Sequence, residues 1–321
     1  MLRNYFTIAW RTLWRNCSTT AINLIGLAVS LAVCFLVLLF VHQQWRMDRF
    51  HPQADRIHRV ETTDGARWTA TSPNPLAPAL RSRAAGVTAA TRVGLDRGTF
   101  ATRGDTSVRL SARYADSSFF NVFSGFRLRS GNRKTALDEP NTAVLTPDFA
   151  RRLFGDDADP VGQTFSLRGE TTYTVTGVLV PPAGPTHMTG DAFLSYASIA
   201  DPDPGIGAWT SVFSEPWTYV RLAPGTEPAA VTTVVTGLFR DRVPSSEREE
   251  IGFRTRSLFG VQFGGLLMNT ASFRTAVPTY FFVFFLALAG VVLLAAGFNY
   301  VNLTTAQSLR RAKEIGVRKT A

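Results

Sequence analysis

The side chains that most often carry catalytic or metal chemistry are sparse in this sequence and poorly spaced for it. Lysine occurs only at positions 134, 313 and 319, and none follows a glycine, so there is no phosphate-binding loop and we do not expect this chain to hydrolyse ATP. The histidines lack metal-ligand spacing with cysteines or paired acids, so we expect surface or packing roles for them. They are His42, His51, His58 and His187. No cofactor is predicted.

For two further groups of residues, a structural role is a better interpretation than a metal-binding or catalytic role. Asp156, Asp157 and Asp159 could bind a hard cation, but a solvated loop is favoured for this segment. Ser195 and Ser198 lack the sequence context of a nucleophile elbow. Because no catalytic constellation is found, we predict a protein that is not an enzyme.

The densest group of candidate functional residues is a basic run near the C-terminus. It comprises Arg310, Arg311, Lys313, Glu314, Ile315, Gly316, Val317, Arg318 and Lys319. On a helix Glu314 can pair with Arg310 and Arg318, each four residues away, while Ile315 and Val317 remain to dock on an apolar groove. Two interpretations stay open from these residues: a docking segment for a partner, or an anchor that needs only the charges.

An apolar stretch precedes the basic run and must position it. No charged residue occurs between Arg274 and Arg310. Because about 20 apolar residues cross a bilayer core, residues 280–303 are predicted to form a transmembrane helix. Basic residues close to a span favour the cytoplasmic side, so residues 304–321 are predicted to be cytoplasmic.

The N-terminal part contains a second apolar stretch, residues 21–41, which we also predict to be a transmembrane helix. A cleavable signal peptide is the competing interpretation, but the apolar part is too long and no small-residue cleavage site follows Val41. Residues 1–20 are predicted to contain a cytoplasmic amphipathic helix that lies in the membrane interface. The alternative is a half-buried helix of a soluble domain.

Small residues in both predicted spans are candidate helix-packing positions, because they let helix backbones approach closely. They are Gly26, Ser30, Ala289, Gly290, Ala296 and Gly297. The two cysteines, Cys17 and Cys34, lie in or beside the first span, and we expect them to be free thiols with packing roles.

The net charge of +10 is concentrated at the flanks of the predicted spans. Residues 1–41 contain three arginines and no acid, and residues 280–321 contain five basic residues and Glu314. The remaining 26 basic and 23 acidic residues nearly balance, so the charge indicates membrane topology, and no nucleic-acid partner is predicted. Long segments translocate largely regardless of charge, which favours placing residues 42–279 outside the cytoplasm.

Short strands and helices alternate in residues 42–279, which predicts an α+β domain, with two lobes and a seam near residues 105 to 215. The predicted strands are 57–63, 87–95, 99–103, 107–114, 142–145, 163–167, 173–179, 217–222 and 252–258. Helices are predicted up to Ala84 and at 117–123, 148–154 and 227–240, and a loop at 206–214. The fold class is therefore a membrane protein with two transmembrane helices flanking an α+β extracytoplasmic domain.

Several motifs, in the same order along nearly the whole chain, resemble a known family. The segment 309–321, after a span that ends 298–306, looks like the one that follows the second membrane helix in FtsX-like permeases of MacB-type ABC transporters. Six further segments resemble parts of the MacB-like periplasmic core domain of such permeases. They are Asp48-Arg-Phe-His51 and the segments 55–60, 139–145, 152–155, 159–164 and 173–178.

The resemblance implies a permease subunit that transmits the ATP-driven motion of a separate ATPase to a periplasmic domain, to export or extract a substrate. It implies that residues 310–319 contact this ATP-binding subunit, that the protein is multi-pass in the cytoplasmic (inner) membrane, and that permease units form a homo- or heterodimer. It also implies further spans, so we expect this chain to be the N-terminal part of the permease. The alternative function is a membrane receptor with an extracytoplasmic sensor domain, which would continue into a heptad-patterned linker.

Overall fold

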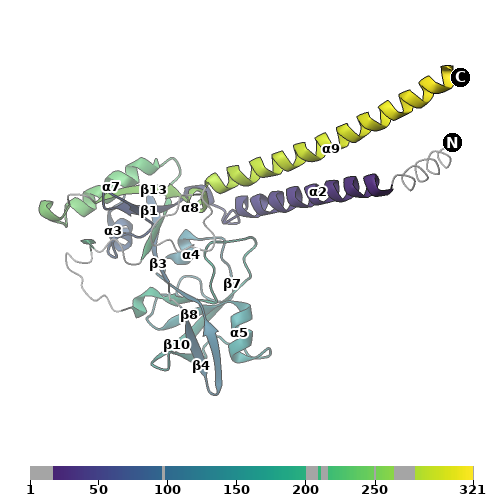
Figure 1. The fold of residues 1–321 in the computed structure, drawn as a ribbon. Helices are drawn as coiled ribbons and strands as arrows, with labels where there is room; N and C mark the ends of the chain where they lie inside the picture. Colours follow the sequence, from purple (N-terminus) through teal and green to yellow (C-terminus); the bar gives the residue numbers. More distant parts are fainter. Residues whose placement is uncertain are drawn as a thin grey trace. The chain divides into compact units, whose positions relative to one another are not determined.

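The computed structural model describes residues 17–95, 98–199, 209–210, 216–248, 251–263 and 279–320, which belong to two compact units (Figure 1). The helical unit contains α2 (Cys17–Trp45) and α9 (Thr279–Thr320). The α/β unit, within residues 46–278, contains the other elements. The predicted amphipathic helix before Cys17 lies outside the described residues, as does the predicted loop at 206–214 apart from Trp209–Thr210.

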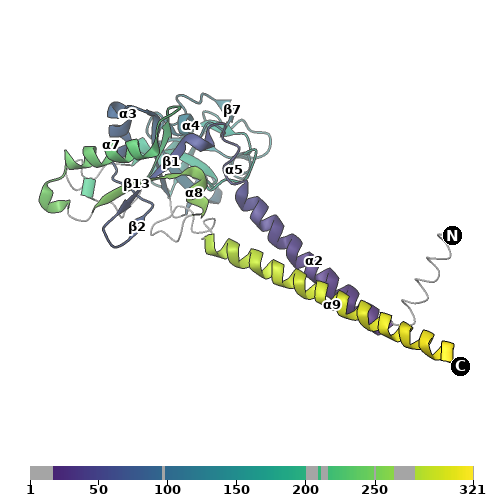
Figure 2. The same ribbon diagram turned by 90° about the horizontal axis from the view of Figure 1, so that it is seen from above.

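The two helices of the helical unit lie side by side and antiparallel (Figures 1 and 2). The ring of Phe40 is 5.8 Å from that of Phe282 and 6.0 Å from that of Phe285. Nearer the start of α2, the Cys34 thiol lies 3.5 Å from the carbonyl oxygen of Ala289. The contact therefore consists of aromatic stacking and of small residues.

Both helices contain stretches that are long and apolar enough to cross a membrane, Leu24–Trp45 and Tyr280–Asn302. Away from the contact, Leu36, Leu294 and Phe298 are each more than 60% exposed. Exposed apolar side chains of this kind are more stable in hydrocarbon than in water, so the outer faces of both helices are suited to contact with lipid. The α9 helix continues beyond the predicted span to Thr320, because residues 304–320 contain no proline and many good helix formers.

The α/β unit is built from short elements. Its helices are η1 (Ala54–Arg56), α3 (Leu76–Arg83), α4 (Phe119–Val122), α5 (Pro147–Phe154), η2 (Tyr196–Ser198), α7 (Pro228–Arg240), η3 (Ser245–Glu247) and α8 (Leu258–Phe263). Its strands are β1 (Ile57–Thr63), β2 (Trp68–Thr69), β3 (Val87–Leu95), β4 (Thr99–Arg103), β5 (Thr106–Leu110), β6 (Ala112–Ala115), β7 (Leu128–Gly131), β8 (Thr142–Leu145), β9 (Thr164–Leu167), β10 (Thr171–Leu179), β11 (Ala192–Ser195), β12 (Trp217–Leu222) and β13 (Gly252–Ser257).

In the described part of the chain these thirteen strands form one mixed sheet, in the order β13-β1-β12-β3-β6-β11-β8-β10-β9-β4-β5, with β2 beside β1 and β7 beside β10. The first long strand, β1, pairs antiparallel with both β12 and β13. The strand that begins the unit and the strand that ends it are therefore neighbours at one end of the sheet.

The chain leaves this end after β3 and returns to it at β12, so the residues between form the other end of the sheet. On the β1 end, α3 and α7 cover a core that includes Val60, Val220 and Val235. On the far end, α5 contributes Phe149 and Leu153 to a second core. The two predicted lobes thus share one continuous sheet.

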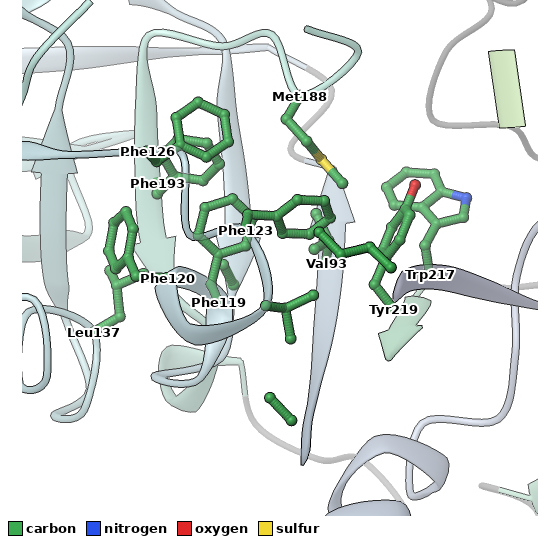
Figure 3. Close-up of a cluster of buried hydrophobic side chains, with 14 of the residues drawn as sticks. Val93, Phe119, Phe120, Phe123, Phe126, Leu137, Met188, Phe193, Trp217 and Tyr219 are labelled. Atoms are coloured by element: carbon green, nitrogen blue, oxygen red, sulfur yellow. The ribbon is translucent and has the colours of Figure 1, made fainter. Parts of the chain in front are cut away.

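An aromatic cluster fills the centre of the α/β unit (Figure 3). The α4 segment supplies Phe119, Phe120 and Phe123, which meet Phe193 of β11 and Tyr219 of β12. The rings of Phe119 and Phe193 are 4.5 Å apart. Each such ring contributes roughly 1.5–3 kcal/mol by burial, so the cluster is a main source of the stability of the α/β unit.

One predicted strand, 107–114, is wrong, because the structure divides it into β5 and β6. The Ser111 N–H donates to the Asp191 carboxylate at 3.0 Å, and the Ser111 carbonyl accepts from the Asp191 N–H at 2.6 Å. These bonds hold the break, so that β5 pairs with β4 while β6 pairs with β3 and β11.

Candidate functional site

The first functional candidate is Asp48, three residues after the end of α2. Its φ is +57°, in the left-handed region that non-glycine residues seldom adopt, and its side chain is 3% exposed. The carboxylate accepts hydrogen bonds from the Thr186 hydroxyl at 2.6 Å and from the His187 N–H at 3.3 Å, and its Oδ2 lies 2.5 Å from His187 Nδ1. The Asp48 N–H donates to the Pro185 carbonyl at 2.8 Å, so the strained residue is held at both backbone and side chain.

The second part of the site joins His187 to the sheet. His187 Nε2 lies 2.9 Å from the hydroxyl of Tyr219 on β12, and both residues are at most 1% exposed. Burial alone would raise the pKa of the Asp48 carboxyl, but the pair with His187 outweighs burial and lowers that pKa below its usual 3.8. Burial raises the pKa of the Tyr219 hydroxyl, and the charge of Arg59 acts in the opposite direction.

The third part is a charge cluster on β1 and β13. Arg59, opposite Tyr219 in the register of β1 and β12, donates from Nη2 to Glu61 at 2.6 Å. Arg254 and Arg256 of β13 each donate from Nε to the same carboxylate at 2.8 Å. Burial would raise the pKa of Glu61, but Arg59 first and then the other two arginines lower it.

These three parts together are termed the buried polar network: Asp48, His187, Tyr219, Arg59, Glu61, Arg254 and Arg256. Its centre is buried, and the two arginines of β13 are half-buried at its edge. It extends from the segment that follows α2 to β13, the last strand of the unit. Asp48, His187 and Tyr219 have the order of a proton relay, but each is at most 3% exposed, so these groups are packed against one another and not presented to solvent. The arrangement is suited to holding the two ends of the unit together.

His51 fastens the same segment by a different contact. Its Nδ1 accepts a hydrogen bond from the Gly125 N–H at 3.0 Å, and its ring lies 5.3 to 5.4 Å from the rings of Phe123 and Phe126. A side chain at Gly125 would place its Cβ 2.6 Å from that nitrogen, so glycine is required for the close approach. Burial lowers the pKa of His51 from 6.5 to about 4, so the ring is neutral at pH 7.

The lowered pKa predicts an acid-sensitive α/β unit. The unfolded chain takes up a proton on His51 near pH 6.5 and the folded chain only near pH 4, so stability falls as the pH falls between these values, by roughly 3 kcal/mol in total. Urea unfolding of the detergent-solubilised chain, followed by tryptophan fluorescence at pH 7 and pH 4.5, should show this loss.

His51→Gln should reduce the dependence of the unfolding free energy on pH. A residual dependence should remain from His58, because burial also lowers the pKa of that residue. His42→Gln, at an exposed position, is the control, and an unchanged slope in His51→Gln would refute the assignment.

The residues singled out from the sequence have diverse locations. The backbone of residues 310–319 belongs to α9, and their side chains lie outside what the structure describes. Of the packing candidates, Ala289 is 8% exposed at the contact with Cys34. A Cβ added at Gly26, Gly290 or Gly297 would have no neighbouring atom within 4 Å. Ser30 donates a hydrogen bond to the Gly26 carbonyl of its own helix, and Ala296 is half-buried. The glycine faces therefore stay open in the α2–α9 pair.

The remaining candidates have structural partners. Ser195 donates to the Leu137 carbonyl, and Ser198 accepts from the Asn141 N–H. Asp159 accepts from the Val161 N–H within its own loop. In the described ranges, no group of three or more His, Cys, Asp or Glu side chains is placed to hold a metal ion.

Sequence reasoning missed the buried polar network as a site. Asp48 and His187 are 139 residues apart, and no local pattern links them. The one available signal was the motif Asp48-Arg-Phe-His51, whose charged and aromatic residues directly follow a span.

Comparisons with known proteins give the family. The sequence profile of the MacB-like periplasmic core domain matches residues 20–238. A sequence comparison with curated proteins gives no match. A solved domain of a proposed permease protein from Porphyromonas gingivalis is similar in fold, with a TM-score of 0.55 and 21% identity over 64% of this chain and 92% of that chain.

Two other solved structures are more distant. The periplasmic region of MacB from Actinobacillus actinomycetemcomitans has a TM-score of 0.46 at 12% identity and covers 65% of this chain and 92% of its own. The extracellular domain of the ABC-type transporter YknZ from Gram-positive bacteria has a TM-score of 0.43 at 13% identity and covers 62% and 99%. On the profile match and the motif order, the chain belongs to the MacB-like periplasmic core domain family of FtsX-like ABC transporter permeases.

Proposed function

We propose that this chain is a permease subunit that transmits the ATP-driven motion of a separate ATPase to its α/β unit, for export or extraction of a substrate. The observation that carries the proposal is the continuity of α9. The candidate span Tyr280–Asn302 and the basic run 310–319 belong to one helix of 42 residues. ATP hydrolysis is assigned to the partner subunit.

A continuous helix suits the transmission of force. At 1.5 Å per residue, the 42 residues of α9 extend about 63 Å, roughly twice the thickness of a hydrocarbon core. Hydrogen bonds within the helix make it resist bending, so displacement of its basic end moves its other end. In this proposal the basic end is cytoplasmic and the α/β unit is periplasmic.

The α/β unit is suited to receive that motion. Its first and last strands, β1 and β13, pair over six residue positions, and the buried polar network crosses both. A displacement delivered at either end is therefore applied to one stiff region of the sheet, next to the aromatic cluster.

The basic run supplies the proposed contact with the ATPase. Glu314 would pair with Arg310 and Arg318 on one face of α9, and Ile315 and Val317 would enter an apolar groove of the partner, with Arg311, Lys313 and Lys319 at its rim. The open glycine faces at Gly26, Gly290 and Gly297 would accept further spans or a second permease unit, giving the homo- or heterodimer implied by the family.

A binding measurement tests the coupling contact. In a complete permease carrying this segment, Glu314→Lys should weaken pull-down of the ATPase encoded by a neighbouring gene at least tenfold, because it replaces an attractive pair with like charges. Glu314→Gln, which keeps the size and removes only the charge, should weaken it less. Undiminished pull-down by Glu314→Lys, at equal membrane expression, would refute the contact.

A further inference from the structure

A cleft of about 400 Å³ opens on the α/β unit between the segment that follows α2 and helix α8. Its walls include Met47, Arg49, His51 and Asp55 from the first segment and Leu258 and Phe259 from the second. All of these residues lie within the α/β unit. Of the cleft's lining, Asp48 belongs to the buried polar network and His51 fastens the same segment through Gly125. Arg49, Asp55, Leu258 and Phe259 belong to neither arrangement.

The cleft combines both charges with apolar surface. Arg49 is exposed, and its guanidinium lies 4.8 Å from the centre of the Phe259 ring, which is itself 41% exposed. Asp55 is an exposed carboxylate on the same lining. A ligand that matches this lining has an anionic group, a cationic group and an apolar part.

His51 adds a donor that lacks an acceptor. Because its Nδ1 accepts from the Gly125 N–H, the proton of the neutral ring is on Nε2. Nε2 is buried and has no hydrogen-bond partner among the described residues, although His51 lines the cleft. A buried N–H without an acceptor costs free energy, which a ligand oxygen would recover.

Chain connectivity limits where the cleft can be. Trp45, the last residue of α2, is 53% exposed and of the type enriched at membrane–water interfaces. Arg49 is four residues further on, so its Cα is within about 14 Å of that of Trp45. Phospholipid headgroups are the molecules concentrated at this level.

We propose that the cleft binds the headgroup of a zwitterionic aminophospholipid, phosphatidylethanolamine. Arg49 and the His51 Nε2–H bind the phosphate, Asp55 accepts from the primary ammonium, and Leu258 and Phe259 pack on the glycerol and the first acyl carbons. The bound lipid would then attach the segment that begins the α/β unit to the membrane, in addition to the covalent connection through α2.

Native mass spectrometry of the delipidated full chain in detergent tests the proposal. We expect one saturable phosphatidylethanolamine adduct, bound about tenfold more tightly than phosphatidylcholine, whose quaternary amine has no N–H for Asp55, or phosphatidylglycerol, which has no amine. Asp55→Asn should remove the preference over phosphatidylcholine, and Arg49→Ala should weaken all three lipids about tenfold.

Arg83→Ala and Asp138→Asn, at exposed positions outside the cleft, are the matched controls, and far-UV circular dichroism checks folding. Equal binding of the three lipids, or a preference unaffected by Asp55→Asn, would overturn the proposal. Displacement of phosphatidylethanolamine by inorganic phosphate as effectively as by phosphorylethanolamine would also overturn it, because the cleft would then be a simple anion site.

Discussion

Asp48→Ala is expected to destabilise the α/β unit by about 3–5 kcal/mol, because it leaves several buried donors without their acceptor, at roughly 1–3 kcal/mol each. The substitution leaves His187, which is 1% exposed, without the carboxylate that it contacts at 2.5 Å. It also removes the acceptor of the Thr186 hydroxyl and of the His187 N–H. Because the wild-type pKa of Asp48 is lowered, its contribution is complete above pH 3.8 and is lost as the pH falls below that value.

A double-mutant cycle with His187→Ala isolates the pair. The double variant should lose less stability than the sum of the two single losses, by 0.5–3 kcal/mol as an order-of-magnitude expectation for contacting residues. Urea unfolding at pH 7 measures all four forms, and Asp138→Ala, at an exposed carboxylate, should change stability by no more than about 0.5 kcal/mol. If the stability losses of Asp48→Ala and His187→Ala simply add in the double variant, the Asp48–His187 contact does not stabilise the segment that follows α2.

Ser308→Pro is expected to abolish ATP-driven transport by a complete permease without abolishing its binding of the ATPase. Position 308 lies in α9, after the candidate span and before the basic run. Proline there removes the N–H of residue 308 and clashes with the preceding turn, which costs about 3 kcal/mol and kinks the helix. The basic run would still bind its partner, but its displacement would bend the kink rather than move the span.

Transport and pull-down are measured together for this variant. Ser308→Ala, which removes the hydroxyl that donates to the Thr304 carbonyl at 2.9 Å but keeps the helix, is the matched control and should transport normally. Normal transport by Ser308→Pro would contradict a role for α9 as a stiff rod. Loss of pull-down in Ser308→Pro would show instead that the proline disrupts the binding segment itself.

The sequence predicts the local elements of this fold well. The bounds predicted for β1, β3, β4, β8 and β12 are confirmed residue for residue, because alternating or β-branched runs end at glycine, proline or charged residues. Helices α5 and α7 begin within one residue of their predicted starts, since Pro147 and Pro228 are suited to a first helical turn. The two apolar stretches could be recognised as candidate spans from their length and apolar composition alone.

The rest depended on contacts between distant residues. The strands β7 and β11 are four residues long and carry no pattern of their own, since pairing with β10 in one case and with β6 and β8 in the other defines them. The predicted strand 252–258 ends one residue early, because the Ser257 hydroxyl accepts the Gly260 N–H and α8 begins at Leu258. The buried polar network was out of reach for the same reason, because a charge is recognised as buried only when its partner is known.

Hydrogen exchange in the reconstituted complex of the complete permease and its ATPase tests most directly whether motion reaches the α/β unit. We predict that exchange at residues 48–51 and 252–257 changes several-fold between the nucleotide-free and ATP-bound complexes, and that Ser308→Pro abolishes this change. If exchange in both segments is the same with and without ATP while the ATPase remains bound and active, the proposed transmission through α9 and the buried polar network is contradicted.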